Sequence, residues 1–233
     1  MYSFESRIRY SEVDVDEKLP LDGIINYFQD CSTFHSEDVG VGLDYLIAHH
    51  RAWVLSSWQI IVDRYPKFGE HITVGTWAYA FQGFIGSRNF IMKDEAGQQI
   101  ACANSIWVYL DTETGKPARL DEFERAAYAL EPKLDMEYAS RKIRLPEAYK
   151  AMRSITVLEH HLDTNHHVNN GQYIKMALGL LTEHQNIRQM RAEYRKPAKL
   201  GDVMQSKLYA EEGRQIIALC DDAGEPYSVV EFC

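Results

Sequence analysis

The stretch Leu21-Asp-Gly-Ile-Ile-Asn-Tyr-Phe-Gln-Asp-Cys-Ser-Thr-Phe34 sets the architecture of the first half of this chain. Its apolar side chains recur three and four residues apart, which is the spacing of one face of an α-helix. Pro20 precedes the stretch and Gly40 follows it, and these residue types are common at the start and just past the end of a helix. The stretch therefore predicts a single amphipathic helix.

Several β-rich segments surround this helix. A short strand-like piece, residues 6–10, precedes it, and longer ones follow at residues 52–63, 71–80, 84–93 and 100–111. Turn residues such as Asp94-Glu-Ala-Gly97 separate the longer segments. Because no helical pattern interrupts these strands, we expect an antiparallel sheet and an α+β fold.

The second half of the chain repeats this order. A helix is predicted after Asn170, with apolar residues reaching Leu181, and strands at residues 187–194, 203–210, 214–220 and 227–232. The turn Asp221-Asp-Ala-Gly224 matches the turn that begins at Asp94. We therefore expect two copies of one unit, residues 1–125 and 153–233, joined by a surface crossover, residues 126–152, with a short helix at 121–130.

Just before the second helix lies Asp163-Thr-Asn-His-His-Val-Asn-Asn170, followed by Gly171-Gln-Tyr-Ile174. A carboxylate, amides and imidazoles at a helix start suit acyl transfer or hydrolysis, which needs a base and a donor for the oxyanion. The alternative is that Asp163, Asn165 and Asn170 serve as turn and cap residues. The first copy has Asp14-x-Asp16-x-Lys18 here, without amide or imidazole, so the chemistry is expected in the second copy.

Composition narrows the functional class. Of 233 residues, 45% are hydrophobic and 25% charged, which is typical of a globular protein. A net charge of −9 argues against general nucleic-acid binding. No apolar run approaches the ~20 residues of a membrane span, and no targeting pattern opens the chain, so a cytoplasmic location is expected. The dispersed cysteines and adjacent histidine pairs predict neither disulfides nor a metal site, and no cofactor is expected.

Several motifs together resemble the acyl-[acyl-carrier-protein] thioesterases of plant plastids and bacteria, over nearly the whole chain. They are the motif from Asp163 to Ile174, Tyr65-Pro-Lys-Phe-Gly69, Ile100-Ala-Cys-Ala-Asn-Ser-Ile-Trp-Val-Tyr-Leu-Asp111 with Lys116-Pro117, and Glu193-Tyr-Arg195. The Asp163 motif alone indicates the broader hot-dog superfamily. The resemblance implies two tandem hot-dog units, each a long helix wrapped by an antiparallel sheet, forming a pseudo-dimer.

The resemblance implies a thioesterase of fatty acid biosynthesis that hydrolyses medium- or long-chain acyl-acyl carrier protein and releases free fatty acid. Acyl carrier protein is the implied partner. Hydrolysis of acyl-CoA and a non-catalytic acyl-binding role remain alternatives, whereas a dehydratase-type lyase ranks lower because its usual histidine-plus-acid arrangement is not seen. The tandem units remove the usual need for a second chain, although a homodimer stays open.

Roles for the motif residues follow from this chemistry. His167 is the predicted general base or water-orienting group, since imidazole titrates near neutral pH. Asn165 is expected to hold the water or the carbonyl oxygen, and Asp163 to orient the motif or act as base. Free N–H groups at the start of the second helix would add to the oxyanion site. The predicted substrate-binding residues are Asn169, Asn170 and Tyr173, with Trp53 and Phe84 for the acyl chain in the first unit.

One position departs from the family pattern. Relatives carry an acidic residue, followed in plants by cysteine, where this chain has Pro197 and Ala198, and neither can act as base or nucleophile. Glu193 lies four residues earlier, roughly 13 Å away along a strand. Asp163 is therefore expected to carry more of the catalytic work than in relatives.

Acyl carrier proteins are acidic, so a chain of this net charge must dock through a local basic surface. The candidates are Arg141, Lys142, Arg144, Lys150, Arg153, Arg188, Arg191, Arg195, Lys196 and Lys199.

Overall fold

The computed structural model describes residues 1–163, 165–181, 187–211 and 213–233. Internal contacts divide the chain into an N-terminal unit, residues 1–56 and 60–138, and a C-terminal unit, residues 57–59 and 139–233. This division falls inside the segment 126–152 that the sequence assigns to the crossover. The predicted domain limits 1–125 and 153–233 stay a prediction.

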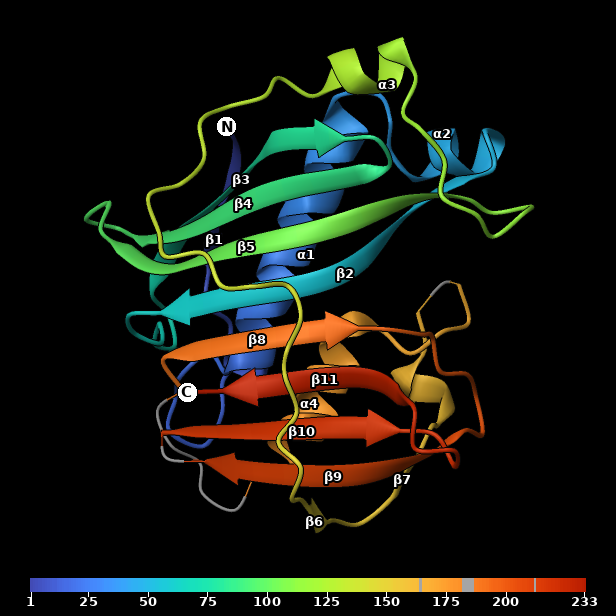
Figure 1. The fold of residues 1–233 in the computed structure, drawn as a ribbon. Coiled ribbons are helices and arrows are strands. Elements are labelled where there is room, and N and C mark those ends of the chain that lie inside the picture. The colour runs from blue at the N-terminus through green and yellow to red at the C-terminus, as the bar shows by residue number, and fades with distance from the viewer. Residues whose placement is uncertain (164, 182–186, 212) are drawn as a thin grey trace. The chain divides into compact units, whose positions relative to one another are not determined.

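In the N-terminal unit, one long helix, α1, packs against an antiparallel sheet (Figure 1). Strands follow each other in the order β1-β3-β4-β5-β2. The helix α1 buries Ile24, Ile25, Phe28 and Cys31, and the rings of Phe28 and Phe90 lie 5.3 Å apart. The elements are β1 (Tyr2–Arg7), α1 (Leu21–Asp38), α2 (Leu43–Ala48), β2 (Arg51–Val62), β3 (His71–Gln82), β4 (Ile85–Asp94), β5 (Gln99–Asp111) and α3 (Glu122–Ala127).

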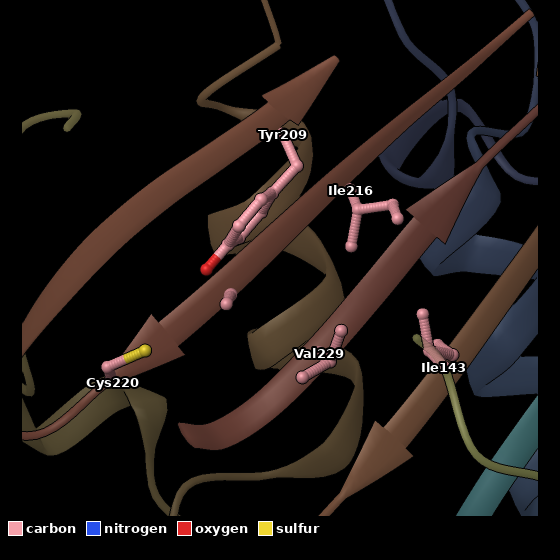
Figure 2. Packing of buried hydrophobic residues seen from close by; sticks show 6 residues of the cluster. Ile143, Tyr209, Ile216, Cys220 and Val229 are labelled. Carbon is pink, nitrogen blue, oxygen red and sulfur yellow. The ribbon is translucent and has the colours of Figure 1, made fainter. Parts of the chain in front are cut away.

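The C-terminal unit has the same plan with a shorter helix. Its strand order is β8-β11-β10-β9-β6, and β7 also pairs with β9. Its elements are β6 (Lys150–Ala151), β7 (Ile155–Thr156), α4 (Asn170–Leu178), β8 (Gln189–Tyr194), β9 (Val203–Glu211), β10 (Arg214–Cys220) and β11 (Pro226–Phe232). One sheet face packs on the crossover, where Ile143 joins Tyr209, Ile216 and Val229 in a buried cluster (Figure 2).

The structure differs from the prediction at several elements. The first strand is Tyr2–Arg7 and not residues 6–10, because Tyr10–Glu12 forms a 3-10 turn in which Glu12 accepts the Arg9 N–H at 2.9 Å. The helix α2 is absent from the prediction, since six residues are too few to show a helical period. The second helix ends at Leu178, before the apolar Leu181, with Gly179 as its C-cap.

The loops that precede the two helices α1 and α4 contain the same side-chain-to-backbone hydrogen bonds. Asp14 Oδ1 accepts the N–H groups of Asp16 and Lys18 at 2.9 and 3.0 Å. Asp163 Oδ1 accepts those of Asn165 and His167 at 2.8 and 3.2 Å. Each loop also contains one residue with a positive φ, Glu17 at 59° and His166 at 58°. The loops are therefore structural counterparts.

A second repeat links each loop to the turn that follows the first long strand of its unit. Leu19 N–H donates to Pro66 O at 2.8 Å, and Val168 N–H donates to Ala198 O at 3.0 Å. Pro66 and Ala198 are thus counterparts.

A third repeat lies in the turns beginning at Asp94 and Asp221. Gln98 N–H donates to Asp94 Oδ1 at 2.9 Å, and Glu225 N–H to Asp221 Oδ1 at 2.8 Å. Together with the two other repeats, these bonds confirm the predicted pair of helix-and-sheet units.

Candidate functional site

The loop from Asp163 to His167 is a closed hydrogen-bonded turn. Besides the two bonds to Asp163 Oδ1, Asp163 N–H donates to His167 O at 2.8 Å, and His166 N–H donates to Asp163 O at 3.1 Å. The carboxylate of Asp163 thus holds the backbone of both Asn165 and His167. The turn role considered for Asp163 is confirmed, and a catalytic role is compatible with it.

The predicted base and amide lie on the accessible side of this loop. Asn165 is exposed and His167 half-buried, whereas the next residue, Val168, is buried and bonded to Ala198 O. Within the described residues, neither side chain makes a hydrogen bond to the protein. Both side chains are therefore free to bind a substrate atom or a water molecule.

The start of α4 is capped by Asn169, not by Asn170. Asn169 Oδ1 accepts the Gly171 N–H at 2.8 Å, and Asn169 O accepts the Gln172 N–H at 2.9 Å. Two of the N–H groups expected to be free are thus already bonded, so that expectation is wrong for them. In the part of the chain that the structure describes, the Asn170 N–H has no acceptor, and it remains the candidate oxyanion donor.

Tyr173 is the fourth residue of α4 and is buried, with 3% of its surface exposed. Its Oη accepts the Ala198 N–H at 2.8 Å. Burial raises the pKa of Tyr173 to about 12, and nearby negative charges including Asp163 add to the increase. Tyr194 stands beside it, with ring centroids 5.8 Å apart, and donates its hydroxyl to Asn170 O at 3.0 Å. The sequence analysis includes Tyr194 only within the motif Glu193-Tyr-Arg195 and gives it no role in the site, because one tyrosine in a strand is typical of ordinary packing.

Ala198, one of the two residues where the family resemblance predicts that an acid and a cysteine are replaced, lies against the motif loop. Ala198 is fully buried, with its N–H on Tyr173 and its carbonyl on Val168. Glu193 does not replace the acid, since its Oε2 accepts the Ile143 N–H at 3.0 Å and its Oε1 pairs with Arg195 at 3.2 Å. Its carboxylate thus anchors the crossover to the sheet.

Trp53 and Phe84 belong to the N-terminal unit and have different surroundings. Trp53 packs on Tyr109 and Phe81, with ring centroids 4.7 and 6.1 Å apart. A Cβ on Gly86 would lie 2.9 Å from the Trp53 ring, so glycine is what allows this close contact. Phe84 lies in the turn between β3 and β4 and is 40% exposed. An acyl-binding role for either residue stays a prediction.

A cavity of about 310 Å³ in the C-terminal unit is lined by Leu181, Ile187, Phe232, Cys233 and neighbouring residues. None of the predicted site residues belongs to this lining, so we do not assign it to the site. Over residues 1–163, 165–181, 187–211 and 213–233, no group of three His, Cys, Asp or Glu side chains could hold a metal ion. The described helices include none that is long and apolar enough to cross a membrane.

Comparison with known proteins points to one family. The model of the acyl-ACP thioesterase N-terminal domain matches residues 1–128, and that of the C-terminal domain matches residues 146–222. The palmitoyl-acyl carrier protein thioesterase of Gossypium hirsutum, a chloroplastic protein, is 26% identical over 88% of this chain and 54% of its own length. The oleoyl-acyl carrier protein thioesterase 2 of Arabidopsis thaliana, also chloroplastic, is 25% identical over 91% of this chain and 63% of its own length. The chain thus spans about half the length of the curated relatives it matches.

Solved structures share the fold. An acyl-ACP thioesterase from Bacteroides thetaiotaomicron superposes with a TM-score of 0.90 at 24% identity, covering 99% of this chain and 96% of its own. A 12:0-ACP thioesterase from Umbellularia californica gives 0.83 at 22% identity, covering 100% and 96%. The predicted α+β fold with hot-dog units is confirmed.

Proposed function

Because this chain belongs to the acyl-ACP thioesterase family, we propose that it hydrolyses medium- or long-chain acyl-acyl carrier protein and releases free fatty acid. The observation that carries the proposal is the difference between two matching loops. Asp14 and Asp163 hold their loops in the same way, but only the second loop presents an amide and an imidazole, Asn165 and His167. Duplicated backbone geometry with chemistry in one copy is expected when one unit is specialised for the reaction.

In the proposed reaction, a water oxygen attacks the thioester carbonyl carbon while His167 takes the water proton. The Asn165 amide donates to the carbonyl oxygen or holds the water, and the Asn170 N–H lies at the helix start where negative charge is favoured. The carbon–sulfur bond then breaks, and the thiol of the phosphopantetheine arm leaves with a proton. Asp163 holds the backbone of Asn165 and His167 through its carboxylate, and it is the alternative base.

The experiment is thiol release from acyl-acyl carrier proteins of varied chain length, with Asn165→Ala and His167→Ala compared with wild type. We expect each variant to lose about 10²-fold or more in kcat, the typical cost of removing an oxyanion donor or a general base. Asp16→Ala and Lys18→Ala are matched controls at the corresponding positions of the other loop, and they should keep wild-type kcat. Full activity in both Asn165→Ala and His167→Ala would contradict these roles.

The same assay tests the two alternatives. Faster turnover of acyl-CoA than of acyl-acyl carrier protein would favour the CoA thioesterase, and no thiol release from either would leave the acyl-binding role. The proposal includes a reducing compartment such as the cytoplasm, which four free cysteines, three of them buried, support. Homodimer formation remains part of the proposal, and light scattering against a chain mass of 26.9 kDa tests it.

A further inference from the structure

A row of four side chains, three of which carry hydroxyls, crosses the sheet of the C-terminal unit. Strand register pairs Tyr194 with Ser228, Ser228 with Leu219, and Leu219 with Ser206, so these four residues lie side by side on one face. Tyr194 donates to Asn170 O, the carbonyl of the first residue of α4. The row therefore lies on the face that α4 covers.

The matching row of the N-terminal unit is entirely apolar. Asp63 N–H donates to Ile100 O and Arg195 N–H to Tyr227 O, both at 2.9 Å, which aligns the two sheets. On this alignment Val62, Ala101, Met92 and Val74 occupy the places of Tyr194, Ser228, Leu219 and Ser206. Three positions that are aliphatic in the N-terminal unit thus carry hydroxyls in the unit with the candidate site.

The same contrast holds where the helix meets the motif loop. Tyr173 corresponds to Ile24, and Ala198 to Pro66. Proline has no N–H to donate and isoleucine no hydroxyl to accept, so the N-terminal unit cannot make the Ala198–Tyr173 bond. Only the C-terminal unit therefore has both partners of this buried hydrogen bond, the Ala198 N–H and the Tyr173 hydroxyl.

Stability alone does not account for these hydroxyls. Among the described residues, Ser206 Oγ and Ser228 Oγ are buried without a hydrogen-bond partner. An unpaired buried hydroxyl is unfavourable, and the matching places of the N-terminal unit hold valine and alanine instead.

From this contrast we propose that Tyr173 and Tyr194 are positioning residues for the hydrolysis, an inference that rests on the proposed function. Tyr194 fixes the first turn of α4 through Asn170 O. Tyr173 fixes Ala198, whose carbonyl holds Val168 N–H, and Val168 directly follows His167. Two hydrogen bonds thus connect the Tyr173 hydroxyl to the backbone of Val168, next to the proposed base His167. They also connect Ala198 to the loop that contains Asp163 and His167.

The test is Tyr173→Phe, which keeps the ring and removes the hydroxyl, assayed with acyl-acyl carrier protein. We expect kcat to fall about tenfold or more, because small displacements of reacting groups are costly, while KM stays within about twofold. Tyr27→Phe is the matched control, since Tyr27 is a helix tyrosine of the N-terminal unit, 6% exposed, whose hydroxyl bonds Ser6 and Glu12. Both variants should lower Tm by about 2–8 °C, but the control should keep its kcat.

Amide hydrogen exchange gives a readout independent of activity. In Tyr173→Phe the amides of Ala198 and Val168 should exchange faster than in wild type, whereas Tyr27→Phe should leave them unchanged. Unchanged kcat in Tyr173→Phe, or an equal loss in Tyr27→Phe, would overturn the inference. If Tyr173→Phe does not fold, Tyr194→Phe tests the same inference: a loss of about tenfold or more in kcat supports it, and wild-type kcat overturns it. A wild-type chain without thioesterase activity refutes the proposed function, and an Ala198 amide unchanged in Tyr173→Phe refutes the positioning inference separately.

Discussion

Asp163 has the structural role in the loop that the sequence offered as an alternative to catalysis. Its Oδ1 accepts two loop N–H groups, as Asp14 does in the other unit, where no amide or imidazole follows. An acceptor oxygen at this place is therefore needed for the loop, whatever the carboxylate adds to the chemistry. The negative charge and the acceptor oxygen can be separated, because asparagine retains an acceptor oxygen of the same shape.

Asp163→Asn should keep both loop bonds and remove the charge. We expect kcat to fall at least about tenfold, since the variant removes the carboxylate proposed as the alternative base, while Tm changes by less than about 2 °C. Steady-state kinetics on an acyl-acyl carrier protein and a thermal melt provide the measurements. Asp14→Asn is the control and should retain wild-type kcat. Full activity in Asp163→Asn would limit Asp163 to building the loop.

At the scale of elements, a buried ion-pair cluster fastens the crossover to the C-terminal sheet. Glu231 on β11 is 3% exposed and pairs with Arg191 at 2.7 Å and with Arg214 at 2.9 Å. Arg191 also donates to the carbonyls of Ser140 and Lys142 in the crossover. The Glu231 carboxylate thus orients the Arg191 guanidinium, which holds this segment of the crossover. The next crossover residue, Ile143, belongs to the buried cluster shown in Figure 2.

Glu231→Gln should destabilise the protein by about 3 kcal/mol, because it leaves the largely buried Arg191 without its counter-charge. Urea unfolding at neutral pH measures this loss. Glu211→Gln removes the other, 44% exposed, partner of Arg214 and should cost no more than about 1 kcal/mol. Equal losses in the two variants would show that burial of Glu231 adds nothing.

At the scale of the whole molecule, the charge distribution decides how an acidic partner can dock. The net charge is −9, and several candidate cations are already paired: Arg191 with Glu231, Arg195 with Glu193, and Lys196 with Asp221. The exposed Lys142, Arg144 and Lys150 of the crossover make no ion pair with the residues that the structure describes. These three are the candidates for contact with acyl carrier protein within the crossover.

We therefore expect kcat/KM for acyl-acyl carrier protein to fall steeply between low and physiological salt, because ions screen exposed charges. Arg144→Glu combined with Lys150→Glu should lower kcat/KM about tenfold at low salt and flatten the salt dependence. Arg9→Glu, an exposed charge reversal in the N-terminal unit, serves as the control. A double variant with wild-type salt dependence would place docking elsewhere.

The sequence by itself determined the long helix after Pro20, the long strands, the duplication and the place of the motif. These features are local, since helical period, strand composition and turn residues act within a few positions along the chain. The family resemblance was also readable from residue order, and the loss of the acid at Pro197 and Ala198 stays a prediction.

Tertiary structure alone decided which groups meet. The bond between Ala198 N–H and Tyr173 joins residues 25 positions apart, and the pairing of Glu231 with Arg191 joins residues 40 apart. Neither pairing leaves a periodic signal, because a contact across a sheet depends on strand order and register. The same reason explains why Asn169 and not Asn170 caps α4: the backbone geometry at the loop, not the residue type, selects between two adjacent asparagines.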